Sequence, residues 1–183
     1  MMTADEQQLL HRIAQQSILN GLQHSQALAI KLDDYAESLR EQRATFVTLH
    51  IAQELRGCIG TLIPHRPLVE DIAHNAYAAA FSDPRFAPLQ AQEFELLDYH
   101  LSILSPTSPM SFSSEEDLLR QIRPGIDGLI LKEKHQQGTF LPSVWEQLPQ
   151  KEAFWQQLKL KAGLATNYWS DSLQVSRYSV ESF

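Results

Sequence analysis

The chain has 183 residues, 43% of them hydrophobic and only 7 of them glycine, which is typical of a globular protein rather than a disordered or fibrous one. Its 15 basic and 22 acidic residues give a net charge of −7. No run of Lys or Arg forms a basic stripe, which argues against broad binding of nucleic-acid phosphates. The sequence shows neither a signal-peptide pattern nor about 18 continuous apolar residues, so we expect no export by that route and no membrane span.

The predicted elements mix helices and strands. In chain order they are a helix from the capping box at Thr3–Glu6 to about Leu28, strands over 45–51 and 55–62, a helix from Pro67 to about Ser82, a strand over 97–103, a short helix over 115–121, strands over 126–133 and 138–141, a helix over 151–162 and a final strand near 173–180. The first two strands neighbour each other as a hairpin around Gln53-Glu54. This order favours one α+β domain over a doubly wound sheet. The Ser/Pro-rich stretch 105–114 is the best candidate for a boundary between subregions.

A possible reactive group lies in the second strand of that hairpin. Residues two apart in a strand share a face, so Arg56 and Cys58 should project together. A guanidinium beside a thiol favours the nucleophilic thiolate. Gly57 and Gly60 would allow a ligand or another chain segment to approach the backbone. The alternative is that Cys58, the only cysteine, is a buried packing residue and that the glycines mark bulges. One cysteine allows no intrachain disulfide, which fits a reducing cytosol.

The heptapeptide Leu55–Thr61 reads LRGCIGT, the hallmark motif of the AMMECR family, also known as protein A of the bacterial AmmeMemoRadiSam system. Further segments resemble the family in the same order: TFVTL at 45–49, DPRF at 83–86, GLI at 128–130, FLP at 140–142 and KAGL at 161–164. The resemblance covers about residues 5–183. Ser143 departs from the glutamine of many relatives, so no role is carried over to it.

This resemblance implies a compact α+β fold with a larger and a smaller subregion, in which an antiparallel or mixed sheet is packed by helices. It also implies a cytoplasmic location and, as partners, a Memo-type protein and a radical S-adenosylmethionine enzyme. No established reaction comes with the family. The sequence carries no P-loop, Rossmann fingerprint, nucleophile elbow or Cys-rich cluster, so no cofactor is expected.

Other polar residues have both a functional and a structural interpretation. Asp83 and Arg85, in the proline-stiffened loop, could orient a ligand or pair with Arg56, or they could tie down the loop by local hydrogen bonds. His74 could act as a base toward Cys58, or it could be an ordinary histidine of a helix. His65 and His74 match no standard zinc spacing, so no metal is expected.

Two classes of function remain open at this stage. The first is an enzyme or enzyme subunit with a ligand-binding or catalytic cleft around the motif, acting on an unknown small molecule. The second is a non-catalytic adaptor that presents the motif strand to a partner. A nucleic-acid role in transcription or translation is disfavoured by the acidic charge.

Overall fold

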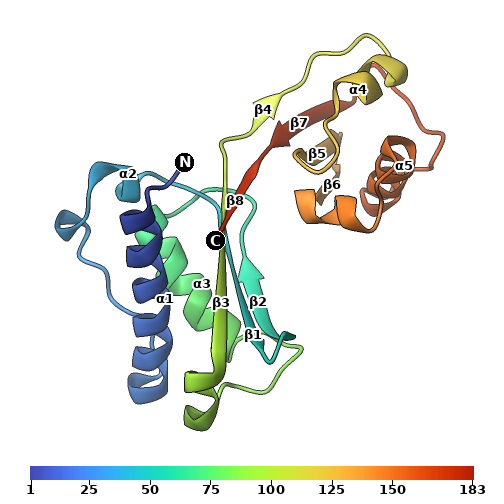
Figure 1. Ribbon diagram of the computed structural model, residues 1–183. Coiled ribbons are helices and arrows are strands. Elements are labelled where there is room, and N and C mark those ends of the chain that lie inside the picture. The colour runs from blue at the N-terminus through green and yellow to red at the C-terminus, as the bar shows by residue number, and fades with distance from the viewer. The chain divides into compact units, whose positions relative to one another are not determined.

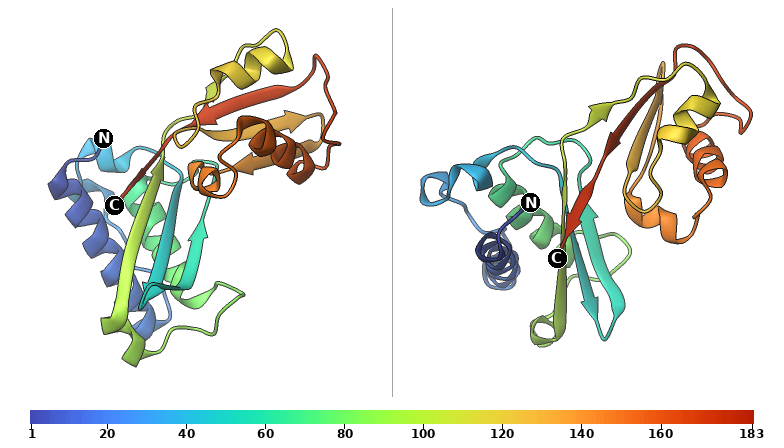
Figure 2. Two further views of the ribbon diagram at one scale, coloured as in Figure 1. Left: turned by 45° about the vertical axis from the view of Figure 1, so that its right-hand side comes forward. Right: turned by 45° about the horizontal axis from the view of Figure 1, so that its top comes forward.

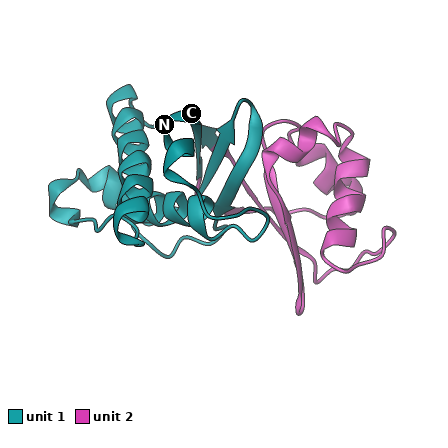
Figure 3. Cartoon of the chain, turned by 90° about the horizontal axis from the view of Figure 1, so that it is seen from below, with its two compact units in different colours: residues 1–104, 181–183 teal, residues 105–180 magenta.

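The computed structural model describes residues 1–183 and divides them into two compact units. Unit 1 comprises Met1–Leu104 and Glu181–Phe183, and unit 2 comprises Ser105–Val180 (Figure 3). The first residue of unit 2 is also the first residue of the Ser/Pro-rich stretch. The larger and the smaller subregion expected from the family resemblance are therefore both present, and the α+β class is confirmed.

Unit 1 contains a four-stranded sheet in the order β2-β1-β3-β8, with β1 (Thr45–Ile51), β2 (Glu54–Gly60), β3 (Leu97–Leu104) and β8 (Val180–Ser182). Strand β1 pairs antiparallel with both β2 and β3, and β2 is an edge strand. The turn of the hairpin is formed by Ala52 and Gln53, which have φ angles of 49° and 68°. Two central residues with positive φ match the right-handed twist of the flanking strands. The turn thus lies one residue earlier than the sequence predicted.

Two helices cover one face of this sheet, here called the inner face (Figure 2). Helix α1 (Ala4–His24) begins at the predicted capping box of Thr3 and Glu6 and ends where Ser25 adopts the left-handed conformation. Helix α3 (Leu68–Phe81) packs against α1, β1 and β2. The core between helices and sheet contains Leu10, Ile13, Val47, Leu49, Ile72, Ala76, Leu101 and Ile103. The short helices of unit 1 are η1 (Leu32–Asp34), α2 (Glu37–Arg40) and η2 (Ala91–Leu96).

Unit 2 contains a second antiparallel sheet in the order β4-β7-β5-β6. Its elements are β4 (Ser108–Pro109), α4 (Glu115–Gln121), β5 (Gly128–Glu133), β6 (Gln136–Phe140), η3 (Pro142–Glu146), α5 (Lys151–Lys161) and β7 (Gln174–Tyr178) (Figure 1). The ring of Trp145 stacks on Phe154 with centroids 3.7 Å apart, and Trp155 is also buried. All three tryptophans, Trp169 included, belong to unit 2, whereas Cys58 belongs to unit 1.

Several predicted boundaries differ from the structure. The first helix ends at His24 instead of Leu28, and Pro67 precedes α3 as its cap instead of opening it. The single final strand is two strands in different sheets, because Ser179 pairs with Ser105 at the point where the chain leaves β7. None of the helices is both long enough and apolar enough to cross a membrane.

Candidate functional site

The LRGCIGT motif lies in β2, where alternate residues point to opposite faces of the sheet. Gly57 pairs with Leu49, whose buried side chain belongs to the core, so both lie on the inner face. Cys58 pairs with Thr48, and Thr48 pairs on its other side with His100 of β3. No helix of unit 1 packs on this second face (Figure 2). We call its polar residues the outer-face group: Thr48, His50, Cys58 and His100. The register shifts between Leu49 and His50, so Arg56 is an extra residue of β2 that has no partner in β1.

Cys58 is a half-buried residue, and its thiol contacts one hydroxyl group. Its Sγ lies 3.1 Å from Oγ1 of Thr48. The backbone N–H and C=O of Cys58 point away from β1, so Cys58 and Thr48 form a non-hydrogen-bonded pair, the type in which side chains come closest. A hydroxyl in this position can donate a hydrogen bond to a thiolate. The structure therefore places Cys58 at the surface of unit 1 and not in its core.

The loop after α3 caps the open edge of β2 at Cys58. Asp83 is only 4% exposed, and its Oδ2 accepts a hydrogen bond of 2.9 Å from the backbone N–H of Cys58. The guanidinium of Arg85 donates to the carbonyl of Cys58 at 3.3 Å and to Asp83 at 2.7 Å. Together the two side chains occupy the hydrogen-bonding groups that another strand would otherwise bind.

Electrostatics stabilises this cap in its ionised form. The hydrogen bonds from Arg85, followed by the one from the Cys58 backbone, hold the pKa of the Asp83 carboxyl far below its ordinary value, although burial opposes them. The pKa of Arg85 is raised, chiefly by its hydrogen bond to Asp83. Asp83 and Arg85 thus tie the loop to the motif strand, as the structural interpretation predicted, and they do so without pairing with Arg56.

Arg56 pairs with Glu93 and not with the Cys58 thiol that its place in the sequence suggested. Its Nε and Nη2 donate to the two carboxylate oxygens of Glu93 at 2.7 and 3.0 Å, and Nη2 also reaches the carbonyl of Ala87 at 2.9 Å. This forked ion pair lowers the pKa of Glu93 and offsets the charge of Arg56. The remaining nitrogen, Nη1, is buried without a hydrogen-bond partner. The cation that touches the Cys58 backbone is therefore Arg85 and not Arg56.

The two glycines of the motif are required by close packing inside the protein. A Cβ on Gly57 would lie 2.0 Å from the carbonyl oxygen of Ala79 in α3. A Cβ on Gly60 would lie 2.3 Å from the ring of Phe46 and 2.4 Å from the carbonyl oxygen of Thr45. The sequence left open the approach of a ligand, the approach of another chain segment, or a bulge. Close approach of other segments explains both positions, and a bulge at Arg56 also directly precedes Gly57.

His74 is not brought to Cys58. It is exposed on α3, which packs on the inner face, and it lines a separate cavity of about 220 Å³ with Arg66 and Leu28. The expected base is thus on the wrong side of the sheet. His65 is exposed and its Nδ1 lies 3.1 Å from the carbonyl oxygen of Ile63. No three His, Cys, Asp or Glu side chains in the chain come together in a way that could hold a metal ion.

Sequence reasoning missed the two histidines of the outer face. The rings of His50 and His100 meet edge to face with centroids 5.3 Å apart, and Nδ1 of His50 is buried without a partner. The alternation of residues 45–51 placed Thr48 and His50 on one face. Nothing local in the sequence, however, indicated that His100 or Glu93 would join them, because both depend on long-range pairing.

These features define a two-unit α+β protein whose signature motif forms a capped edge strand. The sequence matches the AMMECR1 family over residues 11–183, and the chain therefore belongs to that family. A protein of Methanothermobacter thermautotrophicus is 34% identical, with 100% of this chain and 95% of that protein covered. A protein of Thermotoga maritima is 39% identical, with 80% of this chain and 81% of that protein covered.

The fold also resembles a crystal structure. An uncharacterized protein from Pyrococcus horikoshii matches with a TM-score of 0.80 and 31% identity, covering 95% of this chain and 88% of the other. The similarity extends over both units, because 95% of 183 residues cannot be confined to either one. The comparisons establish the family and the fold.

Proposed function

We propose that the outer-face group binds a small-molecule ligand and that Cys58 is the group that reacts with it or holds it. The observation that carries this proposal is the thiol of the half-buried Cys58 beside the Thr48 hydroxyl, on the same face as two imidazoles. A thiol held by a polar neighbour is a better candidate for chemistry than one buried among apolar side chains.

Each residue of the group has a chemical task in this proposal. The Cys58 thiolate is the nucleophile, and the Thr48 hydroxyl donates a hydrogen bond to it. An imidazole of the His50–His100 pair can accept the thiol proton.

The wider role rests on the family resemblance. We propose that residues 5–183 act as one functional domain in the cytoplasm, in a pathway with a Memo-type protein and a radical S-adenosylmethionine enzyme. The chain would then contribute ligand binding or a thiol-dependent step as an enzyme or enzyme subunit.

The decisive measurement is the rate of Cys58 alkylation by a small reagent as a function of pH. The proposal requires that Cys58 react in the native protein and that it react faster at neutral pH than an ordinary exposed thiol. Arg85→Ala should slow the reaction, because it leaves the Asp83 carboxylate uncompensated beside the Cys58 backbone, whereas Arg56→Ala should change the rate little, because neither Arg56 nor its partner Glu93 contacts Cys58. Alkylation of Cys58 only after the protein unfolds would rule out Cys58 as the reacting group.

A second function, an adaptor without catalysis, is favoured by one observation. Two large apolar side chains near the ends of β2 are exposed: Leu55 by 40% and Ile63 by 68%. They are two separate exposed residues and not a continuous apolar patch, and each is a candidate contact for a partner protein. Affinity capture with the wild-type protein and with a Leu55→Asp, Ile63→Asp variant would test it. Recovery of the same partners by both proteins would exclude this surface.

A further inference from the structure

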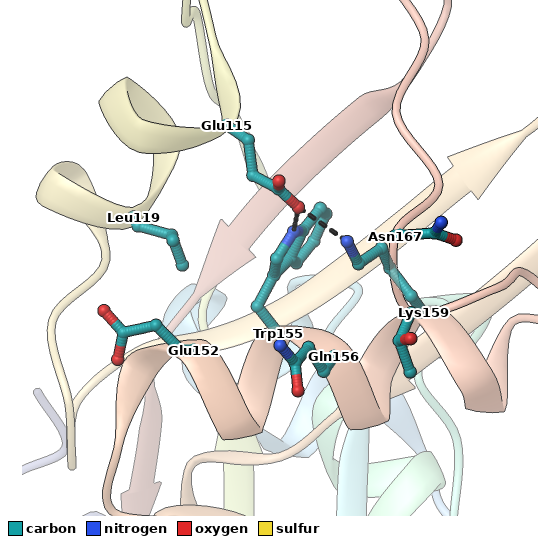
Figure 4. Close-up of a pocket in the computed structure, with 8 residues that line it drawn as sticks. Glu115, Leu119, Glu152, Trp155, Gln156, Lys159 and Asn167 are labelled. Atoms are coloured by element: carbon teal, nitrogen blue, oxygen red, sulfur yellow. Dashed lines mark hydrogen bonds and ion pairs between the residues drawn. The ribbon is translucent and has the colours of Figure 1, made fainter.

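Unit 2 contains a cavity of about 330 Å³ between α4 and α5, and the outer-face group has no part in it. Its polar wall is formed by Glu115 of α4 and by Lys159 of α5, whose side chains point toward one another (Figure 4). Leu119 and Trp155 supply apolar surface, and Glu152 adds a second carboxylate. The volume lies within the range of small-molecule sites.

The carboxylate of Glu115 is fixed by two donors. Its Oε1 accepts hydrogen bonds of 2.6 Å from Nε1 of Trp155 and 2.6 Å from Nζ of Lys159. The Lys159 side chain is only 1% exposed and also donates to the carbonyl oxygen of Tyr168 at 3.3 Å. A buried lysine is tolerated only when its charge is paired, and Glu115 provides that pairing. These contacts leave Oε2 of Glu115 without a hydrogen-bond donor from the protein.

The charges of the cavity do not cancel. Glu115 and Glu152 carry two negative charges, and Lys159 carries one positive charge that Glu115 already binds. Glu152 makes no ion pair within the protein. A positively charged ligand would therefore restore neutrality, and its N–H groups would find Oε2 of Glu115 and the Glu152 carboxylate as acceptors.

We propose that this cavity binds a small organic cation, a guanidinium or primary ammonium compound with a short apolar chain. The cationic group binds between Glu115 and Glu152. The apolar chain lies against Leu119 and Trp155. Gln156 and Asn167 line the same cavity and can hydrogen-bond any further polar group of the ligand.

The test uses n-butylguanidinium as the probe and n-butylurea, which has nearly the same shape and no charge, as its matched control, both titrated calorimetrically into the full chain. We expect measurable binding of butylguanidinium that weakens as salt is raised, and binding of butylurea that is at least about tenfold weaker. Equal affinity for the two probes, or no binding of the cation at millimolar concentration, would overturn the proposal.

Variants then locate the site. Glu115→Gln should weaken binding by about tenfold, because it removes the charge but keeps an oxygen for Trp155 and Lys159. Glu152→Gln should weaken binding by about threefold and leaves the buried pair intact, so it remains informative if the first variant folds poorly. The control is Glu116→Gln on the same helix, whose side chain is 84% exposed and outside the cavity. If Glu116→Gln weakened binding of butylguanidinium as much as Glu152→Gln does, the site could not be this cavity.

Discussion

Replacing Gly57 with alanine tests how closely α3 packs on the motif strand. The added Cβ would lie 2.0 Å from the carbonyl oxygen of Ala79, whereas carbon atoms keep at least 3.0 Å from such neighbours. The helix must therefore move by about 1 Å or more, and the obstacle is backbone that cannot rotate away. Overpacking of this kind costs about 1–3 kcal/mol, and we expect about 3 kcal/mol here because α3 also packs on α1 and β1.

The measurement is urea unfolding followed by far-UV circular dichroism. Gly138→Ala in unit 2 is the graded control, because its nearest obstacle, the backbone nitrogen of Ala162, lies at 2.9 Å and a shift of a few tenths of an ångström relieves it. Gly138→Ala should lower the free energy of unfolding by about 1 kcal/mol. If Gly57→Ala were as stable as the wild type, or gained the roughly 0.4–1 kcal/mol that alanine brings by restricting the unfolded chain, the packing argument would fail.

Three further predictions concern the surroundings of the motif and one tyrosine. Asp83→Asn should lower the free energy of unfolding by about 2 kcal/mol at pH 7. Since the pKa of Asp83 is depressed in the folded state, its contribution is present above about pH 4 and is lost as the pH falls, so the deficit should shrink in acid; a constant deficit would contradict this. Arg56→Lys, which cannot form the fork to Glu93, should cost about 1 kcal/mol and accelerate amide exchange over residues 87–93, and unchanged exchange there would count against that fork. Burial raises the pKa of Tyr99 to about 12, so stability should decline as the pH rises above about 10 in the wild type but less in Tyr99→Phe; parallel declines would argue that Tyr99 is not responsible.

Local patterns predicted two of the elements residue for residue. The alternation over 45–51 corresponds to β1 residue for residue, and the short helix over 115–121 corresponds to α4. Both segments have a clear period and a clear start, since Ser114 caps α4 through the backbone N–H of Asp117. The turn was misplaced because Ala52 and Gln53 adopt positive φ, for which neither residue type is typical.

The partners of the site residues were beyond such patterns. Arg56 is paired with Glu93, 37 positions away, and that contact depends on how the loop after α3 returns along β2. The spacing of Arg56 and Cys58 predicted a shared face, but a β-bulge at Arg56 interrupts the alternation of β2. Spacing on one strand also does not reveal a neutralising residue from another element. The same reason separates His74 from Cys58: a helical period places residues on a helix face without saying on which side of a sheet that helix packs.

The separation of Trp145, Trp155 and Trp169 from Cys58 gives the protein one intrinsic optical reporter and one chemical reporter, each confined to a single unit. Indole emission during denaturation follows unit 2 alone, and the change in the alkylation rate of the lone thiol follows unit 1 alone. Both signals can be followed in one sample. Coincident midpoints of the two signals would indicate a single cooperative transition, and separate midpoints would indicate two folding units on one polypeptide. No label and no engineered residue is needed to distinguish them.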